Sequence, residues 1–566
     1  MITMAQMRIV PARAALLLAA PLVLTLACSA SNEHSGTAGT AGSGAGTAQG
    51  GQAGAGGGAG GGFGGQGGQG GKPVPVDPKT CEEAADAKSY VGCDFWPTVT
   101  DNIVWSTFDY AVVVANNGEA EAAVEVTKNG AVVAQATVPA TSLATLYLPW
   151  VSELKSTDSF LACAPTNVKT ATVRAPGGAY HLTSTVPVTV YQFNAIEYAA
   201  KGGPPGKDWS GCTGLVCQTN GCFSFTNDAS LLLPSTAMTG NYRVTGMPTW
   251  IAPMAEPPNN YYPPYVAITG LTDGTTVTVK LSSTGSVAGG GGIASASAGG
   301  TVSFPIGKGE VVELIAASGG DLSGSLITAT APVQAITGIA CSYMPADVAA
   351  CDHLEETVFP AETLGKDYFV TVPTSHHGTP VGHVVRVYGN IDGTKLTFPG
   401  KNPGVPATIN AGQVVDLGVV KDDFEILGDQ PFAVASFSVG ADMIDPGKPT
   451  AQQKGDPDQS LMVSTEQYRT KYVFLAPSDY DVSFIDVVQP MGATLTLDGA
   501  TVGVAPTAVS SGSGVARIQL GPGNNGAHVL TATEPVGLQV MGYGTYTSYQ
   551  YPGGLNLSEI SIAPPK

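Results

Sequence analysis

One phrase recurs four times and decides the fold: His181-Leu-Thr-Ser-Thr-Val-Pro187-Val-Thr-Val190, Leu326-Ile-Thr-Ala-Thr-Ala-Pro332-Val-Gln-Ala335, Ile426-Leu-Gly-Asp-Gln-Pro431-Phe-Ala-Val434 and Leu530-Thr-Ala-Thr-Glu-Pro535-Val-Gly-Leu538. Apolar residues precede each proline, and after it they alternate with polar or small ones. Proline cannot donate a hydrogen bond to a β-ladder, so it marks strand starts and edges. The phrase therefore predicts a strand, a proline-marked turn and a second strand at domain-sized intervals.

Hairpin signals fill the chain between these phrases. Asp273-Gly274 precedes the alternating run Thr276–Leu281, and Asp498-Gly499 follows Ala493–Leu497, as two-residue turns require. No sustained 3.6-residue apolar period follows residue 110. We predict an all-β fold, a tandem array of about four β-sandwich-like units. The predicted segments are 80–200, 201–345 with a Cys-rich insertion, 346–445 and 446–566.

The N-terminal region predicts export and a membrane anchor. Residues 1–27 contain Arg8 and Arg13, no acidic residue and an apolar run, as in a signal peptide. Their end, Leu24-Thr-Leu-Ala-Cys28, resembles the lipobox of bacterial lipoproteins, although its leucine is one position too far from the cysteine; signal cleavage near Ala30 is the alternative. Residues 28–79 are predicted to be a lipidated Cys28 and a disordered Gly-rich tether. The predicted location is the outer membrane of a Gram-negative bacterium, facing the cell surface or the periplasm.

The cysteine count agrees with export. The chain has nine cysteines, and setting Cys28 aside leaves an even set for disulfides. These candidates are Cys81, Cys93, Cys163, Cys212, Cys217, Cys222, Cys341 and Cys351. The simplest pairs are Cys81–Cys93 and Cys341–Cys351. Cys163 is expected to join one of the central three while the other two close a local loop, with the connectivity left open; zinc is disfavoured there because no histidine is near.

Charge and motifs exclude several functions. The formal net charge of −19 over 566 residues repels nucleic acid and anionic lipid headgroups. The sequence contains no His-Glu-x-x-His, no Gly-x-Ser-x-Gly, no phosphate-binding Gly-x-x-x-x-Gly-Lys and no EF-hand loop. We therefore predict no catalytic, cofactor or metal site.

Four polar clusters could each have a functional or a structural explanation. His376-His377 with His383 could bind a metal, but an exposed loop explains them as well. His353 beside Glu355 and Glu356 could serve acid/base chemistry, but a structural turn is favoured. The remaining two are acidic pairs, for which solvated loops are favoured because calcium needs six to eight oxygen ligands. These pairs are Asp456/Asp458 and Asp479/Asp481.

Aromatic residues on expected loops suggest binding. Trp250, Tyr261, Tyr262 and Tyr265 are predicted to form a surface for a glycan or protein partner, because their rings are apolar with a polar edge. The C-terminal run from Tyr543 to Tyr551 fits packing between units better.

One stretch resembles a known family. Cys341-Ser-Tyr-Met-Pro-Ala-Asp-Val-Ala-Ala-Cys351-Asp-His-Leu-Glu-Glu356, followed by Gly365-Lys-Asp-Tyr-Phe-Val370, resembles the IgGFc-binding protein N-terminal domain family. The resemblance extends to Tyr90–Pro97 and Phe108–Asn116 and covers most of residues 80–550. It implies an extracellular recognition or adhesion module without a known catalytic centre, of the type found in myxobacterial lipoproteins. Immunoglobulin is not carried over as ligand, because no residue here identifies an Fc contact.

The resulting functional hypothesis is an adhesion lipoprotein that binds a glycan or protein through its β units. Two alternatives are a secreted polysaccharide-active enzyme and a structural component of an envelope layer. The ligand and the oligomeric state stay open.

Overall fold

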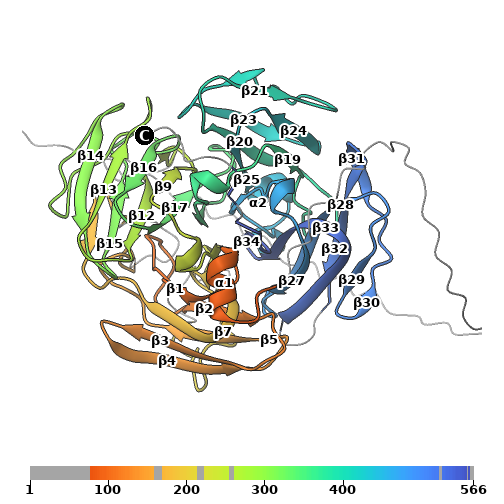
Figure 1. Cartoon of the computed structure of the whole chain (residues 1–566), viewed down its shortest axis with the longest axis horizontal. Helices are drawn as coiled ribbons and strands as arrows, with labels where there is room; N and C mark the ends of the chain where they lie inside the picture. The colour runs from red at the N-terminus through yellow and green to blue at the C-terminus, as the bar shows by residue number, and fades with distance from the viewer. Residues whose placement is uncertain are drawn as a thin grey trace, which may run out of the picture. The chain divides into compact units, whose positions relative to one another are not determined.

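The computed structural model describes residues 77–158, 168–212, 222–253, 260–521, 526–557 and 559–560. Cys28, the Gly-rich segment, Cys163 and Cys217 lie outside them. The described residues belong to one compact unit, Lys72–Lys566. Its strands pair antiparallel throughout, and the described helices are short, so the all-β prediction is confirmed. None of these helices has the length and apolarity needed to cross a membrane. Figure 1 colours the chain from orange in the first segment to blue in the fourth.

The first segment forms a seven-stranded sheet of order β4-β3-β7-β2-β5, with β1 and β8 also paired to β7. Its buried residues alternate along β3 and become continuous along β2, which lies between β7 and β5. The elements are α1 (Cys81–Ala87), β1 (Gly92–Phe95), β2 (Tyr110–Asn116), β3 (Ala122–Lys128), β4 (Ala131–Val138), β5 (Ser142–Leu148), β7 (His181–Phe193) and β8 (Ala229–Leu232).

The second segment is a sandwich of two sheets, β18-β17-β12-β15-β6 and β14-β13-β16-β9, with a separate β10-β11 pair. The two inner faces bury a common apolar cluster. The elements are β6 (Val173–Ala175), η2 (Ser235–Ala237), β9 (Asn241–Arg243), β10 (Trp250–Ile251), β11 (Tyr261–Tyr262), β12 (Pro264–Gly270), β13 (Thr275–Lys280), β14 (Thr301–Ile306), β15 (Val311–Ile315), β16 (Leu326–Ala329), β17 (Val333–Ser342), β18 (Asp352–Thr357) and η3 (Ala361–Thr363).

The third segment repeats the sandwich with sheets β19-β24-β21-β22 and β23-β20-β25-β26. Its elements are β19 (Asp367–Val370), β20 (His383–Gly389), β21 (Thr394–Thr397), β22 (Thr408–Ile409), β23 (Val414–Val420), β24 (Phe424–Gly428), β25 (Phe432–Ser438), α2 (Ala441–Ile444), η4 (Thr450–Gln452), β26 (Gln459–Leu461) and η5 (Thr465–Gln467).

The fourth segment has an eight-stranded sheet of order β30-β29-β33-β28-β32-β31, with β27 and β34 also on β33. Its elements are β27 (Arg469–Leu475), β28 (Val482–Pro490), β29 (Leu495–Leu497), β30 (Ala500–Thr501), β31 (Thr507–Ser510), β32 (Ser513–Leu520), β33 (Ala527–Gly544) and β34 (Thr547–Pro552).

The proline phrases mark the places where the chain changes ladder partners. Pro332 and Pro431 lie in short breaks, between β16 and β17 and between β24 and β25. The predicted turn is absent from the other two copies, because β7 and β33 run continuously through Pro187 and Pro535. Before Pro187, β7 pairs with β3, and after it with β2. The missing N–H thus falls where one ladder ends and the next begins.

The four segments meet through their last strands in a propeller-like arrangement. Strand β8 lies against β18 and β34, and β26 lies against the same two strands. Asp228 joins three of them, since its Oδ2 accepts from the backbone N–H groups of Glu355 (2.9 Å) and Gln459 (3.1 Å). Strands β8, β18 and β26 lie after the predicted boundaries at 200, 345 and 445 in the sequence, but each pairs with the sheet of the preceding segment and is therefore grouped with it.

The largest hydrophobic core is shared by all four segments. It contains Tyr191, Leu354, Phe437 and Tyr551, one from each segment. The Tyr191 and Tyr551 rings lie 4.7 Å apart between centroids, so the C-terminal tyrosines pack between segments, as the sequence favoured. The second and third segments also bury apolar clusters of their own. The shared core exists besides these because the inner strands bury both faces of their sheets.

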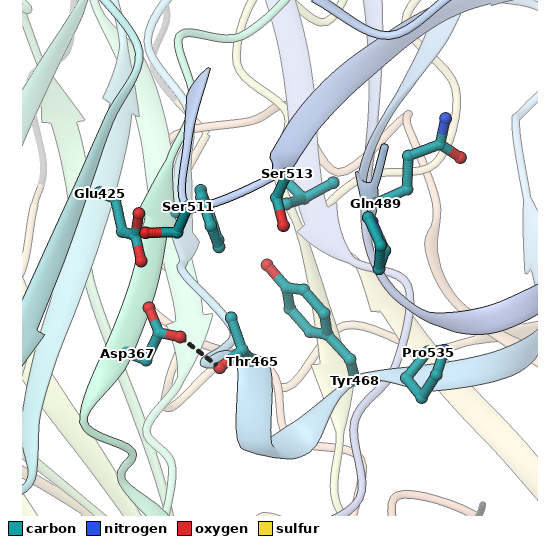
Figure 2. Close-up of a pocket in the computed structure, with 11 residues that line it drawn as sticks. Asp367, Glu425, Thr465, Tyr468, Gln489, Ser511, Ser513 and Pro535 are labelled. Atoms are coloured by element: carbon teal, nitrogen blue, oxygen red, sulfur yellow. Dashed lines mark hydrogen bonds between the residues drawn. The ribbon is translucent and has the colours of Figure 1, made fainter. Parts of the chain in front are cut away.

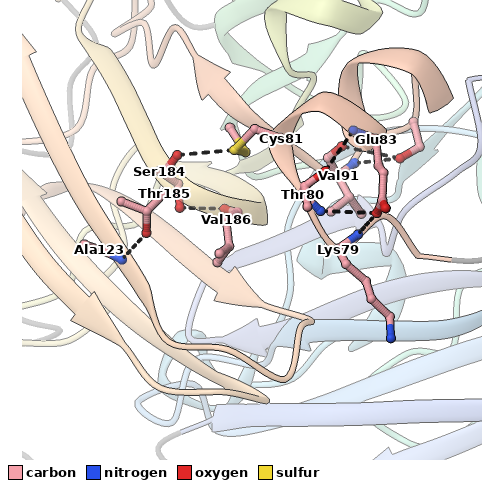
Figure 3. Close-up of a disulfide and its surroundings, with 11 residues drawn as sticks. Lys79, Thr80, Cys81, Glu83, Val91, Ala123, Ser184, Thr185 and Val186 are labelled. Atoms are coloured by element: carbon pink, nitrogen blue, oxygen red, sulfur yellow. Dashed lines mark hydrogen bonds between the residues drawn. A yellow bond between two sulfur atoms is a disulfide. The ribbon is translucent and has the colours of Figure 1, made fainter.

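The start of the described chain is fixed to the first segment by a disulfide (Figure 3). Cys81–Cys93 joins α1 to β1, and the Cys81 Sγ lies 3.6 Å from the Ser184 carbonyl of β7. A capping box starts α1, with the Glu83 N–H donating to Thr80 Oγ1 and the Thr80 N–H to Glu83 Oε2. The helix is therefore held covalently and by its cap.

Candidate binding pocket

A pocket of about 300 Å³ opens between the third and fourth segments. Strands β19 and β24 supply one wall, and η5, β28, β32 and β33 with adjoining turns supply the other. Polar groups converge on it from both segments (Figure 2). The lining residues are Asp367, Phe369, Glu425, Thr465, Tyr468, Val488, Gln489, Pro490, Ser511, Ser513 and Pro535.

Strand register brings two carboxyl groups together in this pocket. Phe369 of β19 lies opposite Glu425 of β24, and Asp367 is two residues before Phe369. Side chains two apart in a strand share a face, so Asp367 and Glu425 are diagonal neighbours on that face. Both carboxyl groups line the pocket, close enough for the Glu425 charge to raise the pKa of Asp367.

The environment of Asp367 disfavours its charged form. Burial, reinforced by the adjacent Glu425 carboxyl, raises the pKa of Asp367 to about 6. Thr465 Oγ1 donates to Asp367 Oδ2 at 2.8 Å, and the Ser510 hydroxyl donates to Glu425. Asp367 Oδ1 has no donor among the described residues. Asp367 Oδ1 can therefore accept a hydrogen bond from a ligand hydroxyl.

The opposite wall presents an aromatic ring and prolines. Figure 2 shows the Tyr468 hydroxyl directed toward Ser513. Gly537 allows the ring to sit close to β33, because a Cβ there would lie 2.5 Å from Tyr468 Cε1. Pro535, from the fourth proline phrase, lines the same wall. Apolar surface beside converging polar groups is typical of small-molecule and saccharide sites.

The aromatic residues predicted as a binding surface lie mostly in the core. Trp250, Tyr262 and Tyr265 are buried, and Tyr261 alone of the four is partly exposed. The Trp250 ring packs against Tyr262 (5.1 Å between centroids) and Tyr343 (4.5 Å). The ring faces therefore pack against one another and are not open to a ligand.

The stretch Asp352–Glu356 is a buried strand rather than the predicted turn. The Glu355 carboxylate accepts hydrogen bonds from four side chains, and burial raises its pKa to about 7. His353 Nε2 lies 2.9 Å from the Tyr265 hydroxyl. The donors to Glu355 are Thr100, Gln192, Asn194 and Ser230. This arrangement holds strands together at the centre.

The solvated-loop expectation is wrong for Asp456 and Asp458, which are fully buried beside the inner strands. Asp479 is partly buried, and its Oδ2 accepts from the Tyr198 N–H at 3.1 Å. Asp481 is exposed. The acidic pairs thus differ in burial, since Asp456 and Asp458 lie beside the inner strands whereas Asp479 and Asp481 lie at a more exposed contact with Tyr198.

The structure separates the predicted histidine cluster. His383 lies buried on β20 with its Nδ1 2.7 Å from Ser436 Oγ. His376 and His377 stay together in the loop before it, beside Asp445.

Three disulfides are present among the described residues. Cys81–Cys93 and Cys341–Cys351 pair as the sequence predicted, and Cys212–Cys222 closes a local loop. They indicate an oxidising, extracellular compartment.

Sequence reasoning missed the pocket. Asp367 lies in a quoted family stretch and Glu425 directly precedes a proline phrase, but only strand register shows that they meet. These two strands are separated in the chain by β20 to β23, so no local sequence signal reveals their pairing.

An exported all-β chain with disulfides and a polar pocket between its segments belongs to the class of extracellular binding modules. The family model described as IgGFc binding protein matches residues 228–542, more than half of the chain and all of the pocket. The chain belongs to this family, which confirms the resemblance and indicates a binding or recognition role.

Two known proteins show how far the similarity reaches. The human IgGFc-binding protein is 26% identical over 236 residues, which are 40% of this chain but only 4% of that protein. A solved GH78 family rhamnosidase of Bacillus sp. GL1 is 9% identical, with 82% of this chain and 55% of that one covered at a TM-score of 0.12. A score this low carries no argument about fold.

Proposed function

We propose that this protein is an extracellular recognition lipoprotein that binds a glycan in the pocket between its third and fourth segments, without catalysis. The observation that carries the proposal is the Asp367–Glu425 carboxyl pair facing Tyr468. Sugars present several hydroxyl groups on an apolar ring face. Carboxyl oxygens accept from such hydroxyls, and the tyrosine and proline surfaces pack against the ring face.

The geometry favours binding over glycoside hydrolysis. A hydrolytic pair holds its two carboxyl groups about 5–9.5 Å apart, so that a sugar carbon or a water fits between them. Asp367 and Glu425 instead lie on the same wall of the pocket, on one face of the β19–β24 ladder, and do not flank the space between the walls. A polysaccharide-active enzyme is the second candidate, because a carboxyl of raised pKa is also what a general acid needs.

A glycan array probed with the full chain tests the pocket. Wild type is expected to bind at least one glycan, and Asp367→Asn/Glu425→Gln to bind it at least about tenfold more weakly, which is 1.4 kcal/mol or more. Glu119→Gln/Glu121→Gln is the matched control, since it removes the same charge from exposed positions and should bind normally. Equal binding by both double variants, or binding only of proteins, would contradict the proposal.

Product analysis separates the two candidates. Incubation of the bound glycan with wild type should leave it intact under the binding proposal. Cleavage that disappears in Asp367→Asn/Glu425→Gln would establish the enzyme instead.

The anchor completes the proposal. Cys28 as an acylated residue and residues 28–79 as a flexible spacer would hold the binding unit near the outer membrane. Labelled palmitate should enter wild type but not Cys28→Ala, and the variant should leave the membrane fraction. A labelled Cys28→Ala variant that stays membrane-bound would contradict this part.

A further inference from the structure

Two adjacent histidines and a buried aspartate converge in a loop cluster outside the pocket. His376 Nε2 lies 2.7 Å from Asp445 Oδ2, and His377 Nε2 lies 2.9 Å from Asp445 Oδ1. The two imidazole rings are 3.8 Å apart between centroids. All three ligand atoms lie within 4.8 Å of one another. Neighbouring side chains in an extended strand point to opposite faces, so the loop must hold this unusual orientation.

The histidine loop is fixed by the fourth segment. The Thr374 N–H donates to Asp486 Oδ2 at 3.0 Å, and the Tyr543 hydroxyl donates to the Thr374 carbonyl at 2.8 Å. His376 and His377 are the two central residues of a turn that the Gly378 N–H closes on the Ser375 carbonyl at 2.8 Å, with Gly378 at a φ of +77°. The imidazoles are therefore positioned before any ligand arrives.

The carboxylate is fixed as well. Asp445 caps the C-terminus of α2, and its Oδ2 also accepts from the Lys454 N–H at 3.1 Å. The Lys454 ammonium is 2.7 Å from Asp481, so its charge is matched locally. The Asp445 side chain is 3% exposed, whereas that of His377 is 47% exposed. One side of the cluster thus faces solvent.

We propose that His376, His377 and Asp445 bind a divalent transition metal of the zinc class, with a fourth position open to water or to a ligand atom of a partner. Two imidazole nitrogens and one carboxylate suit Zn²⁺, Co²⁺ or Ni²⁺, whereas Ca²⁺ and Mg²⁺ prefer all-oxygen sites. Ligand atoms around tetrahedral zinc are about 3.3 Å apart, so the N···O separations need to widen by only about half an ångström.

The same chain offers matched histidine–aspartate pairs that lack the second imidazole. His181 Nε2 lies 2.6 Å from Asp94 Oδ2, and His528 Nδ1 lies 2.7 Å from Asp498 Oδ2. A single histidine and a single carboxylate supply too few protein ligands for a zinc site. These pairs are controls for ordinary hydrogen bonding.

Calorimetric titration of the untagged, chelator-treated full chain with Zn²⁺ tests the proposal, with Co²⁺ absorption as the spectroscopic readout. One equivalent should bind, and Co²⁺ should give the intense visible bands of a low-symmetry site. His377→Ala, His376→Ala and Asp445→Asn should each weaken Zn²⁺ binding at least about tenfold. His528→Ala should bind like wild type.

Because Asp445 is buried, replacing it could disturb the fold. The decisive variant is therefore His377→Ala, at an exposed position, with its fold checked by circular dichroism and thermal unfolding. Unchanged stoichiometric binding in folded His377→Ala, or loss of binding in His528→Ala as well, would overturn the assignment. Wild type that binds neither Zn²⁺ nor Co²⁺ would leave only the hydrogen-bonded triad and would overturn it too.

Discussion

Carboxyl groups occupy two kinds of buried environment in this protein. At the centre, Glu355 accepts from Thr100, Gln192 and Ser230 at 2.8–3.1 Å, and Asn194 is a further donor. In the pocket, Asp367 has one donor on Oδ2 and none among the described residues on Oδ1. A carboxylate saturated by protein donors holds strands together, whereas one left with free acceptor capacity can meet a ligand. Residue type alone does not separate the two roles.

The largest expected loss of stability follows replacement of Glu355, the central carboxylate. Glu355→Leu should lower the free energy of unfolding by about 3–5 kcal/mol, because four buried donors lose their acceptor. Urea denaturation of the full chain measures it. A loss below about 1 kcal/mol would show that the central carboxylate is no more structural than the pocket pair.

The stability contributed by Glu355 at the centre should decrease as pH rises. Burial raises the pKa of Glu355 to about 7 in the folded protein, against 4.5 for an ordinary glutamate, so between these pH values the folded state binds more protons than the unfolded state. The stability contributed by protonated Glu355 is therefore complete below pH 4.5 and is lost as pH rises through about 7, by up to about 3 kcal/mol.

The comparison of wild type with Glu355→Gln isolates this contribution, because other buried carboxyls titrate in both proteins. Denaturation from pH 5 to pH 8 should show a shallower decline in the Gln variant. Parallel curves would mean that Glu355 keeps an ordinary pKa.

The disulfide beside β18 should matter less. Removal of the Cys341–Cys351 bridge, whose sequence separation is 10, by Cys341→Ser/Cys351→Ser should cost about 2–3 kcal/mol through loop entropy. Chemical denaturation without reductant measures the loss, with disulfide-bonded wild type as the reference. An unchanged midpoint would show that hydrogen bonds alone fix the central strand.

The smallest stability change belongs to the pocket. Asp367→Asn removes one acceptor charge from a group with spare capacity and should change the free energy of unfolding by less than about 1 kcal/mol. Glycan binding by the same variant should nevertheless fall. A stability loss as large as that of Glu355→Leu would assign the pocket pair to the scaffold.

The repeated phrases predicted the all-β class and the segment number well, because proline and Asp-Gly pairs act locally on backbone hydrogen bonding. They could not show that β7 and β33 continue through their prolines, since a ladder's partner lies far away in sequence. Likewise, Trp250 and Tyr262 have the composition of a binding surface, and only their mutual packing shows otherwise.

The site was less accessible to sequence reasoning than the fold. His376 and His377 were singled out as a pair, but Asp445 is distant in the chain and no spacing rule links them. Asp367 and Glu425 meet through the register of β19 and β24, which pair although four strands lie between them in the chain.

The attachment of α1 has a mechanical consequence. A pull on the chain that precedes Asp77 first meets the ion pair between Asp77 and Arg469 of β27, and then the covalent bridge from Cys81 to β1. A pulling force is thus transmitted to the fourth segment at Asp77 and to the first segment at Cys81, which are close together in the chain. A load shared between these segments, with a covalent link in its path, resists peeling of α1 from the sheet below it.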